Sequence, residues 1–187
     1  KFFEKHPELA DPGNVRAETA AFVAGYTTHL TLDERWIVEI YRAFFGEHSP
    51  LGGTTEAHLF DRLLQYELDR RKREDRELIT GIQMAMAGAE EAVECGFIDV
   101  DTLHQWRELA ADQLQYPADY DRLRYYSGRQ LRAHGIDPEV PEEFDRFIER
   151  VPELLDAALN HVTPERFDAF VEQSYDSALA AVEAYLR

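Results

Sequence analysis

Apolar residues recur every three or four positions along most of this chain, and glycines and prolines interrupt the pattern at intervals. Segments with the alternating apolar pattern of β-strands are nearly absent. A chain of 187 residues is long enough to bury one sizeable core. We therefore predict an all-α fold, a helical bundle of about six or seven helices that forms a single domain over residues 1–187. The first residue is Lys1 and not methionine, which leaves room for a missing N-terminal segment.

Glycines and prolines set the bounds of the expected helices. Their ranges are 15–45, 54–95, 102–115, 117–135, 141–159 and 164–186. The first range is one long helix or two nearly collinear ones, and Gly81 and Gly88 are candidate breaks in the second. Asp99 or Asp101 is the expected cap of the third helix, and Thr163 is the expected cap of the last.

The strongly acidic composition limits the classes of partner. The formal net charge is −17, which repels phosphate backbones, so we expect no general nucleic-acid binding. No apolar run approaches the roughly 20 residues that a membrane span needs. No secretory leader is visible either, so we expect a cytoplasmic protein, unless a leader precedes Lys1. Cys95 is the only cysteine, which excludes a disulfide framework and a cysteine-based zinc motif.

Two polar residues lie on the apolar stripe of the first long helix. An α-helix advances about 100° per residue, which places Asp33 about 40° from His29. The apolar side chains within about 80° of His29 are Phe22, Tyr26, Trp36, Ile37, Ile40 and Phe44. A carboxylate on a buried face is costly unless it is hydrogen-bonded, paired or bound to a metal. We therefore predict that His29 and Asp33 face inward and are candidate metal ligands.

The same angular test selects Glu67 in the second long helix, where Leu59, Phe60, Leu63 and Leu64 define the apolar arc. Two neighbouring helices would then place a histidine and two carboxylates in the core, as in metal sites of helical bundles. Zinc is the expected metal, with manganese or iron as alternatives. We expect Glu67 to be buried and to approach His29, Tyr26 or a metal held by His29. The alternative is structural: the His–Asp pair is a local hydrogen bond, and Glu67 pairs with an arginine.

The remaining histidines are weaker candidates. His6 and His58 are the two that we retain as further candidate ligands. Walker, dinucleotide-binding, nucleophile-elbow and HExxH motifs are all absent, so no organic cofactor is expected and no catalytic residue is identified.

One segment resembles a known family. The run from Phe22 to Trp36 has the pattern Phe-x-x-Gly-Tyr-x-x-His-x-x-x-Asp-x-x-Trp. It is similar to a helix of the prokaryotic zinc-dependent phospholipase C-like family, in which the histidine and aspartate bind the metal cluster. The resemblance covers about residues 20–70. It implies an all-α fold, up to three zinc ions and a metal-activated water that attacks phosphodiesters, with His29 and Asp33 as ligands.

The sequence departs from that family in two places. The family has a second His-x-x-x-Glu pair, whereas here His58 is followed four residues later by Arg62. The family also uses ligands near its N-terminus, and no matching histidine-rich segment is present. The sequence therefore leaves three alternative functions. The chain is a metal-dependent phosphodiester hydrolase, a non-catalytic helical protein with a buried His/Asp/Glu network, or a homo-oligomer or partner-binding module that uses its amphipathic helices.

Overall fold

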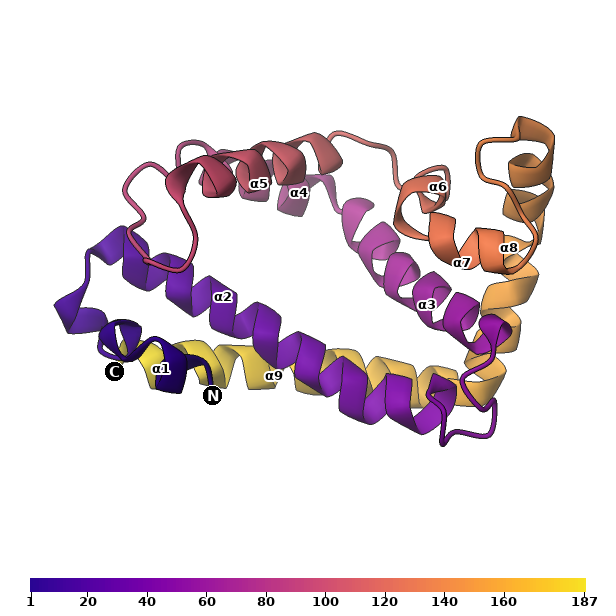
Figure 1. The fold of residues 1–187 in the computed structure, drawn as a ribbon, viewed down its shortest axis with the longest axis horizontal. Helices are drawn as coiled ribbons and strands as arrows, with labels where there is room; N and C mark the ends of the chain where they lie inside the picture. The colour runs from indigo at the N-terminus through magenta and orange to yellow at the C-terminus, as the bar shows by residue number, and fades with distance from the viewer. The chain divides into compact units, whose positions relative to one another are not determined.

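The computed structural model describes all residues from 1 to 187 and contains helices and no strand. The all-α fold predicted from the sequence is confirmed. The α-helices are α1 (Phe2–Lys5), α2 (Ala17–Arg35), α3 (Thr55–Arg73), α4 (Arg76–Met86), α5 (Val100–Gln113), α6 (Leu123–Tyr126), α7 (Gly128–Ala133), α8 (Pro141–Val162) and α9 (Pro164–Leu186). Two short 3₁₀ turns, Pro7–Leu9 and Pro12–Asn14, precede α2, and a π-helical segment, Trp36–Phe45, follows it. Figure 1 traces the chain through these elements.

The chain divides into two compact units. Unit 1 comprises residues 1–34, 76–116 and 172–187, and unit 2 comprises residues 35–75 and 117–171. Each unit is assembled from separate stretches of the chain, so the division is not a boundary between two sequential domains. The single domain expected from the sequence stays a prediction.

Unit 1 is built around the N-terminal half of α2. Val23 and Ala24 of α2 are buried with Leu103 of α5 and Tyr185 of α9. Aromatic rings of the N-terminal segment extend this core, since Phe2 contacts Phe97 edge-on with the ring centroids 5.5 Å apart. Helices α4 and α5 lie side by side in this unit (Figure 1).

Unit 2 is built around α3. This helix packs against α8, α7 and the π-helical segment (Figure 1). The fully buried side chains of this core include Phe45, Leu63, Leu64, Phe144, Val151 and Phe167. The apolar arc predicted for α3 is confirmed, because its leucines at helical spacing all lie in this core.

Local capping explains several helix bounds. Asp99 caps α5 by accepting a hydrogen bond from the backbone amide of Thr102 at 2.8 Å, as expected. Thr163 Oγ1 likewise accepts from the amide of Arg166 at the start of α9. Gly135 has a φ of 76°, the left-handed conformation that ends helices, and it follows His134, the C-cap residue of α7. The expected helix 54–95 breaks after Arg73, before Asp75, and not at Gly81, which lies inside α4.

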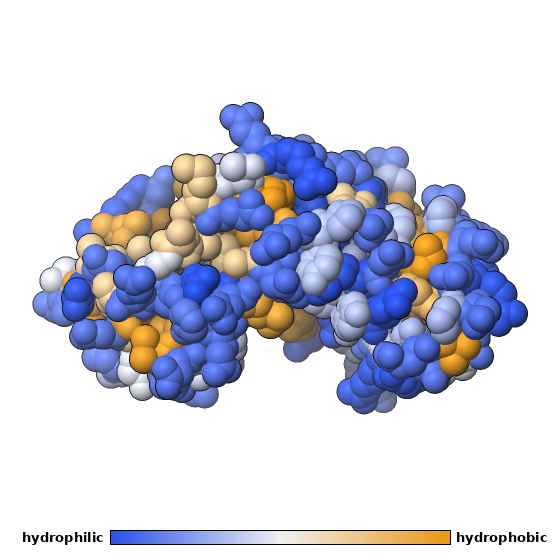
Figure 2. Space-filling view, turned by 90° about the horizontal axis from the view of Figure 1, so that it is seen from above, coloured by the Kyte–Doolittle hydropathy of each residue, from blue (hydrophilic) through white to orange (hydrophobic).

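Hydrophilic residues cover most of the face seen in Figure 2, with hydrophobic residues distributed among them in small groups. None of the helices combines the length and the apolar character needed to span a bilayer.

Candidate functional site

The structure places His29 and Asp33 together but on the surface. His29 Nε2 lies 3.4 Å from Asp33 Oδ2, and the two side chains are 62% and 60% exposed. The prediction that both face inward is therefore wrong. The side chains that α2 buries are Thr19, Ala20, Val23 and Ala24, and at about 100° per residue the last three lie about 120° to 180° away from His29. His29 therefore lies on the side of α2 away from these residues, although Ile40, farther along the chain, is buried in the core of unit 2.

Glu67 is buried, as the angular test predicts. Its side chain is 7% exposed, and both carboxylate oxygens are occupied. Oε2 accepts hydrogen bonds from Arg70 Nε at 2.7 Å and from the Tyr120 hydroxyl at 2.8 Å. Oε1 accepts from Arg71 Nε at 2.8 Å. The structure thus has the arginine-paired arrangement, and every oxygen that could bind a metal already has a donor.

The electrostatics of Glu67 follow from these partners. Burial alone would raise its pKa, but the hydrogen bonds from Arg70, Arg71 and Tyr120 outweigh burial and lower the pKa to about 2. Burial and the hydrogen bond to Glu67 raise the pKa of Tyr120 to about 12. The cluster therefore holds an ionised carboxylate and a neutral phenol near neutral pH.

The weaker histidine candidates have other neighbours. His6 Nδ1 lies 3.6 Å from Glu8, and its ring packs on Phe97 with centroids 4.7 Å apart. His58 stacks on Tyr41 at 6.1 Å. No group of three or more His, Cys, Asp or Glu side chains is arranged to hold a metal ion.

Asp61 is a buried acid that the sequence does not reveal. The angular test puts it on the polar face of α3, yet it is 7% exposed. It accepts hydrogen bonds from the Trp36 indole at 2.8 Å and from Gln65 at 2.9 Å. Burial raises the pKa of Asp61, and these hydrogen bonds oppose that rise only in part. The indole of Trp36 therefore anchors the π-helical segment to α3 within unit 2.

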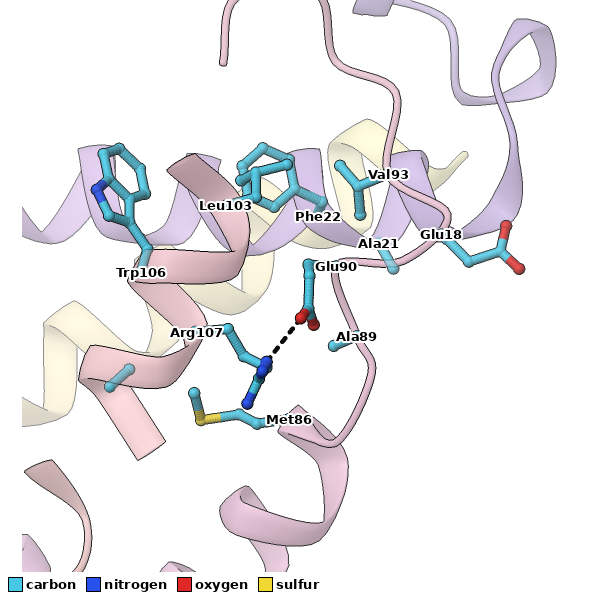
Figure 3. Close-up of a pocket in the computed structure, with 11 residues that line it drawn as sticks. Glu18, Ala21, Phe22, Met86, Ala89, Glu90, Val93, Leu103, Trp106 and Arg107 are labelled. Carbon is cyan, nitrogen blue, oxygen red and sulfur yellow. Dashed lines mark hydrogen bonds and ion pairs between the residues drawn. The ribbon is translucent and has the colours of Figure 1, made fainter. Parts of the chain in front are cut away.

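A pocket lies in unit 1, with a cavity volume of about 490 Å³. Its lining comes from α2, from α5, from the last residue of α4 and from the turn segment that follows it. The apolar lining residues are Ala21, Phe22, Met86, Ala89, Val93, Leu103, Trp106 and Ala110, and the charged ones are Glu18, Glu90 and Arg107. Figure 3 shows Phe22 and Leu103 beside each other and the Glu90–Arg107 pair at one side of the pocket.

Glu90 is the buried charge of this pocket. Its Oε1 accepts from Arg107 Nε at 2.7 Å and lies 2.8 Å from His104 Nδ1. Its Oε2 is buried and has no hydrogen-bond partner. The backbone amide of Glu90 itself and then the guanidinium of Arg107 lower its pKa to about 2. The pocket thus contains a fixed carboxylate with one unused acceptor oxygen.

Sequence reasoning missed this pocket for identifiable reasons. Glu90 lies in a turn segment, where helical angles do not apply. Trp106 of α5 is 51% exposed, and an exposed tryptophan in a helix otherwise rich in polar residues is the signal that could have indicated a binding surface. Comparisons with protein-family models, with curated proteins and with solved structures find no match to this chain.

Proposed function

We propose that this chain is a non-catalytic α-helical binding module and that the pocket of unit 1 takes an apolar group of its ligand. The observation that carries the proposal is the pocket itself. Its volume of about 490 Å³ falls within the roughly 300–1,000 Å³ typical of ligand sites, and eight of its eleven lining residues are apolar. A few polar groups in an apolar lining are the usual composition of such a site.

Trp106 supports a binding role. A half-exposed indole next to an apolar cavity leaves apolar surface in contact with water. Covering that surface gains about 25 cal/mol per Å² of apolar area. Tryptophan is also the residue type most often found to dominate binding energies at interfaces.

The chemistry of the pocket argues against catalysis there. A general acid or base works best when its pKa is close to the operating pH, whereas the pKa of Glu90 is lowered to about 2. Glu90 is therefore ionised and a weak base at neutral pH. No serine, threonine, cysteine, histidine or lysine lines the pocket, so it contains no hydroxyl, thiol, imidazole or amine nucleophile.

The proposal predicts that the neutral fluorescent probe N-phenyl-1-naphthylamine binds in the pocket and that Ala21→Trp abolishes binding. An indole at position 21 fills the cavity that the probe needs. Ala17→Trp is the matched control, because both alanines are exposed residues of α2 and only Ala21 lines the pocket. The probe's own emission, excited directly, gives the binding curve. Equal binding by the two variants, or no binding by the wild-type protein, would count against the proposal.

A metal-dependent phosphodiester hydrolase is the second candidate. The specific observation in its favour is the spacing of 3.4 Å between His29 Nε2 and Asp33 Oδ2, within the segment that resembles the phospholipase C-like family. Three protein ligands are usual in a catalytic zinc site. His29 and Asp33 supply two, and the oxygens of Glu67 are taken by Arg70, Arg71 and Tyr120.

The two candidates differ in their response to metal removal. We expect a chelator to leave the melting temperature of the purified protein unchanged, because a pair that is about 60% exposed adds little to stability. The test combines elemental analysis with melting curves of the wild-type protein and of His29→Ala. Stoichiometric zinc, with a chelator-induced drop in melting temperature that His29→Ala removes, would favour the hydrolase instead.

A further inference from the structure

We infer that the occupant of the pocket is the apolar face of a lysine- or arginine-rich amphipathic helix of a partner protein. This inference rests on the proposed binding function and names the chemistry of its partner. Three observations carry it: the charge of unit 1, the apolar surface that continues beyond the pocket, and the unused oxygen of Glu90.

Unit 1 is far more acidic than a typical domain. Its segments contain 17 acidic and six basic residues, a net charge of −11 out of the −17 of the whole chain. A field of this sign attracts cations and repels anions over the surface. A second copy of the chain would bring the same charge to the same face, so self-association through the pocket is unfavourable. Charge complementarity therefore selects a cationic partner.

The arginines near the pocket do not make the surface around it positive. Arg107 is paired with Glu90, and its Nη2 also lies 3.7 Å from Glu108. Arg16, just before α2, lies 3.3 Å from Glu94 and 3.9 Å from Glu18, which lines the pocket. Each of these guanidinium groups thus faces two carboxylates, and the rim of the pocket stays negative.

The apolar surface extends past the pocket. Leu109 of α5 is 60% exposed and lies three residues after Trp106, so the two side chains are neighbours on the helix surface. Leu109 does not line the cavity, so a small molecule seated among the lining residues would leave it in water. A helix can place one apolar side chain in the pocket and cover neighbouring residues with the side chains one turn away, at i+3 and i+4.

Glu90 provides the polar contact. Its Oε2 has no hydrogen-bond partner, and a buried acceptor without a donor is energetically unfavourable. A lysine or arginine side chain that enters the pocket beside the apolar anchor supplies the missing donor. Such a charge-assisted hydrogen bond is stronger than one between neutral groups.

The test uses a synthetic helical peptide of about 18 leucine and lysine residues, with the leucines on one face. Calorimetry with the full chain is expected to give a micromolar dissociation constant, weakened roughly tenfold or more by Ala21→Trp and unchanged by Ala17→Trp. Two comparison peptides are a leucine–glutamate version with the same apolar face and a leucine–lysine version with scrambled order. Both are expected to bind at least roughly tenfold more weakly than the first.

Four other outcomes would contradict the inference, and each has a different meaning. Equal binding of the ordered and scrambled lysine peptides, insensitive to Ala21→Trp, would mean general attraction to an acidic surface. Displacement of the naphthylamine probe by dodecyltrimethylammonium but not by the peptide would assign the pocket to a small amphiphilic cation. If the probe binds in the pocket and no cation displaces it, the binding function stands and the cationic partner is rejected. If the probe does not bind, the proposed function itself fails.

Discussion

Glu67→Leu is expected to lower the free energy of unfolding by about 3 kcal/mol at neutral pH, the lower end of the range for breaking a buried ion pair. The side chain of Glu67 is 7% exposed and that of Arg70 is 18% exposed. Removal of the carboxylate leaves the Arg70 charge and the Tyr120 hydroxyl without their partner in a mostly buried place. Arg71 is 46% exposed and can turn to solvent, so we expect a loss of stability at the lower end of the range for breaking a buried ion pair. Urea denaturation measures the loss.

Glu74→Gln is the matched control for this substitution. Glu74 pairs with the same Arg70, but its side chain is 59% exposed. Exposed pairs contribute roughly 0–1 kcal/mol, so this variant should stay close to the wild-type protein. Equal losses for Glu67→Leu and Glu74→Gln would contradict the account, because burial would then have no bearing on the strength of the cluster.

The same cluster makes stability depend on pH in a defined direction. The pKa of Glu67 is about 2 in the folded state, against 4.5 for an unperturbed glutamic acid side chain. Its stabilising contribution is therefore fully present above about pH 4.5 and is lost as the pH falls toward 2. Asp61 acts in the opposite sense, since its pKa is raised and its protonation at acid pH relieves the cost of a buried charge. Glu67→Gln should accordingly flatten the acid limb of the stability curve.

Phe144→Ala is expected to cost about 3–5 kcal/mol, the range for removing a buried phenylalanine ring. Phe144 is fully buried in unit 2, where its ring lies 6.1 Å from that of Phe147 and 4.4 Å from the guanidinium carbon of Arg124. Deletion of the ring removes both contacts and leaves a cavity. Urea denaturation of the full chain gives the change in free energy of unfolding.

Tyr175→Ala is the comparison for that loss. Tyr175 is 70% exposed, so its removal should change stability by no more than about 0.5 kcal/mol. A loss of similar size in both variants would contradict the placement of Phe144 in the core.

Properties that depend on near neighbours along the chain follow from the sequence. Asp99 and Gly135 end or begin helices through their own backbone and side-chain chemistry, so their roles were predictable. The burial of Glu67 was predictable for a related reason: α3 is a regular α-helix, and a constant angle per residue places Glu67 among its leucines. Only part of what the buried carboxylate meets was predictable: Arg70 and Arg71 lie one helical turn away, whereas Tyr120 lies 53 residues away along the chain.

Three features were decided only by the tertiary structure. The exposure of His29 and Asp33 depends on which side of α2 packs into the core of unit 1, and that side carries Ala20, Val23 and Ala24. Asp61 is buried because the Trp36 indole reaches it across 25 residues of sequence. The pocket in unit 1 joins α2, α5 and the turn that contains Glu90. The sequence by itself thus determined the all-α class, the helix caps and the apolar face of α3, because each depends on residues within a few turns of one another. Packing between distant segments decided which side of α2 is exposed, what encloses Glu67 and Asp61, and where a ligand can bind, since those contacts have no regular spacing in the sequence.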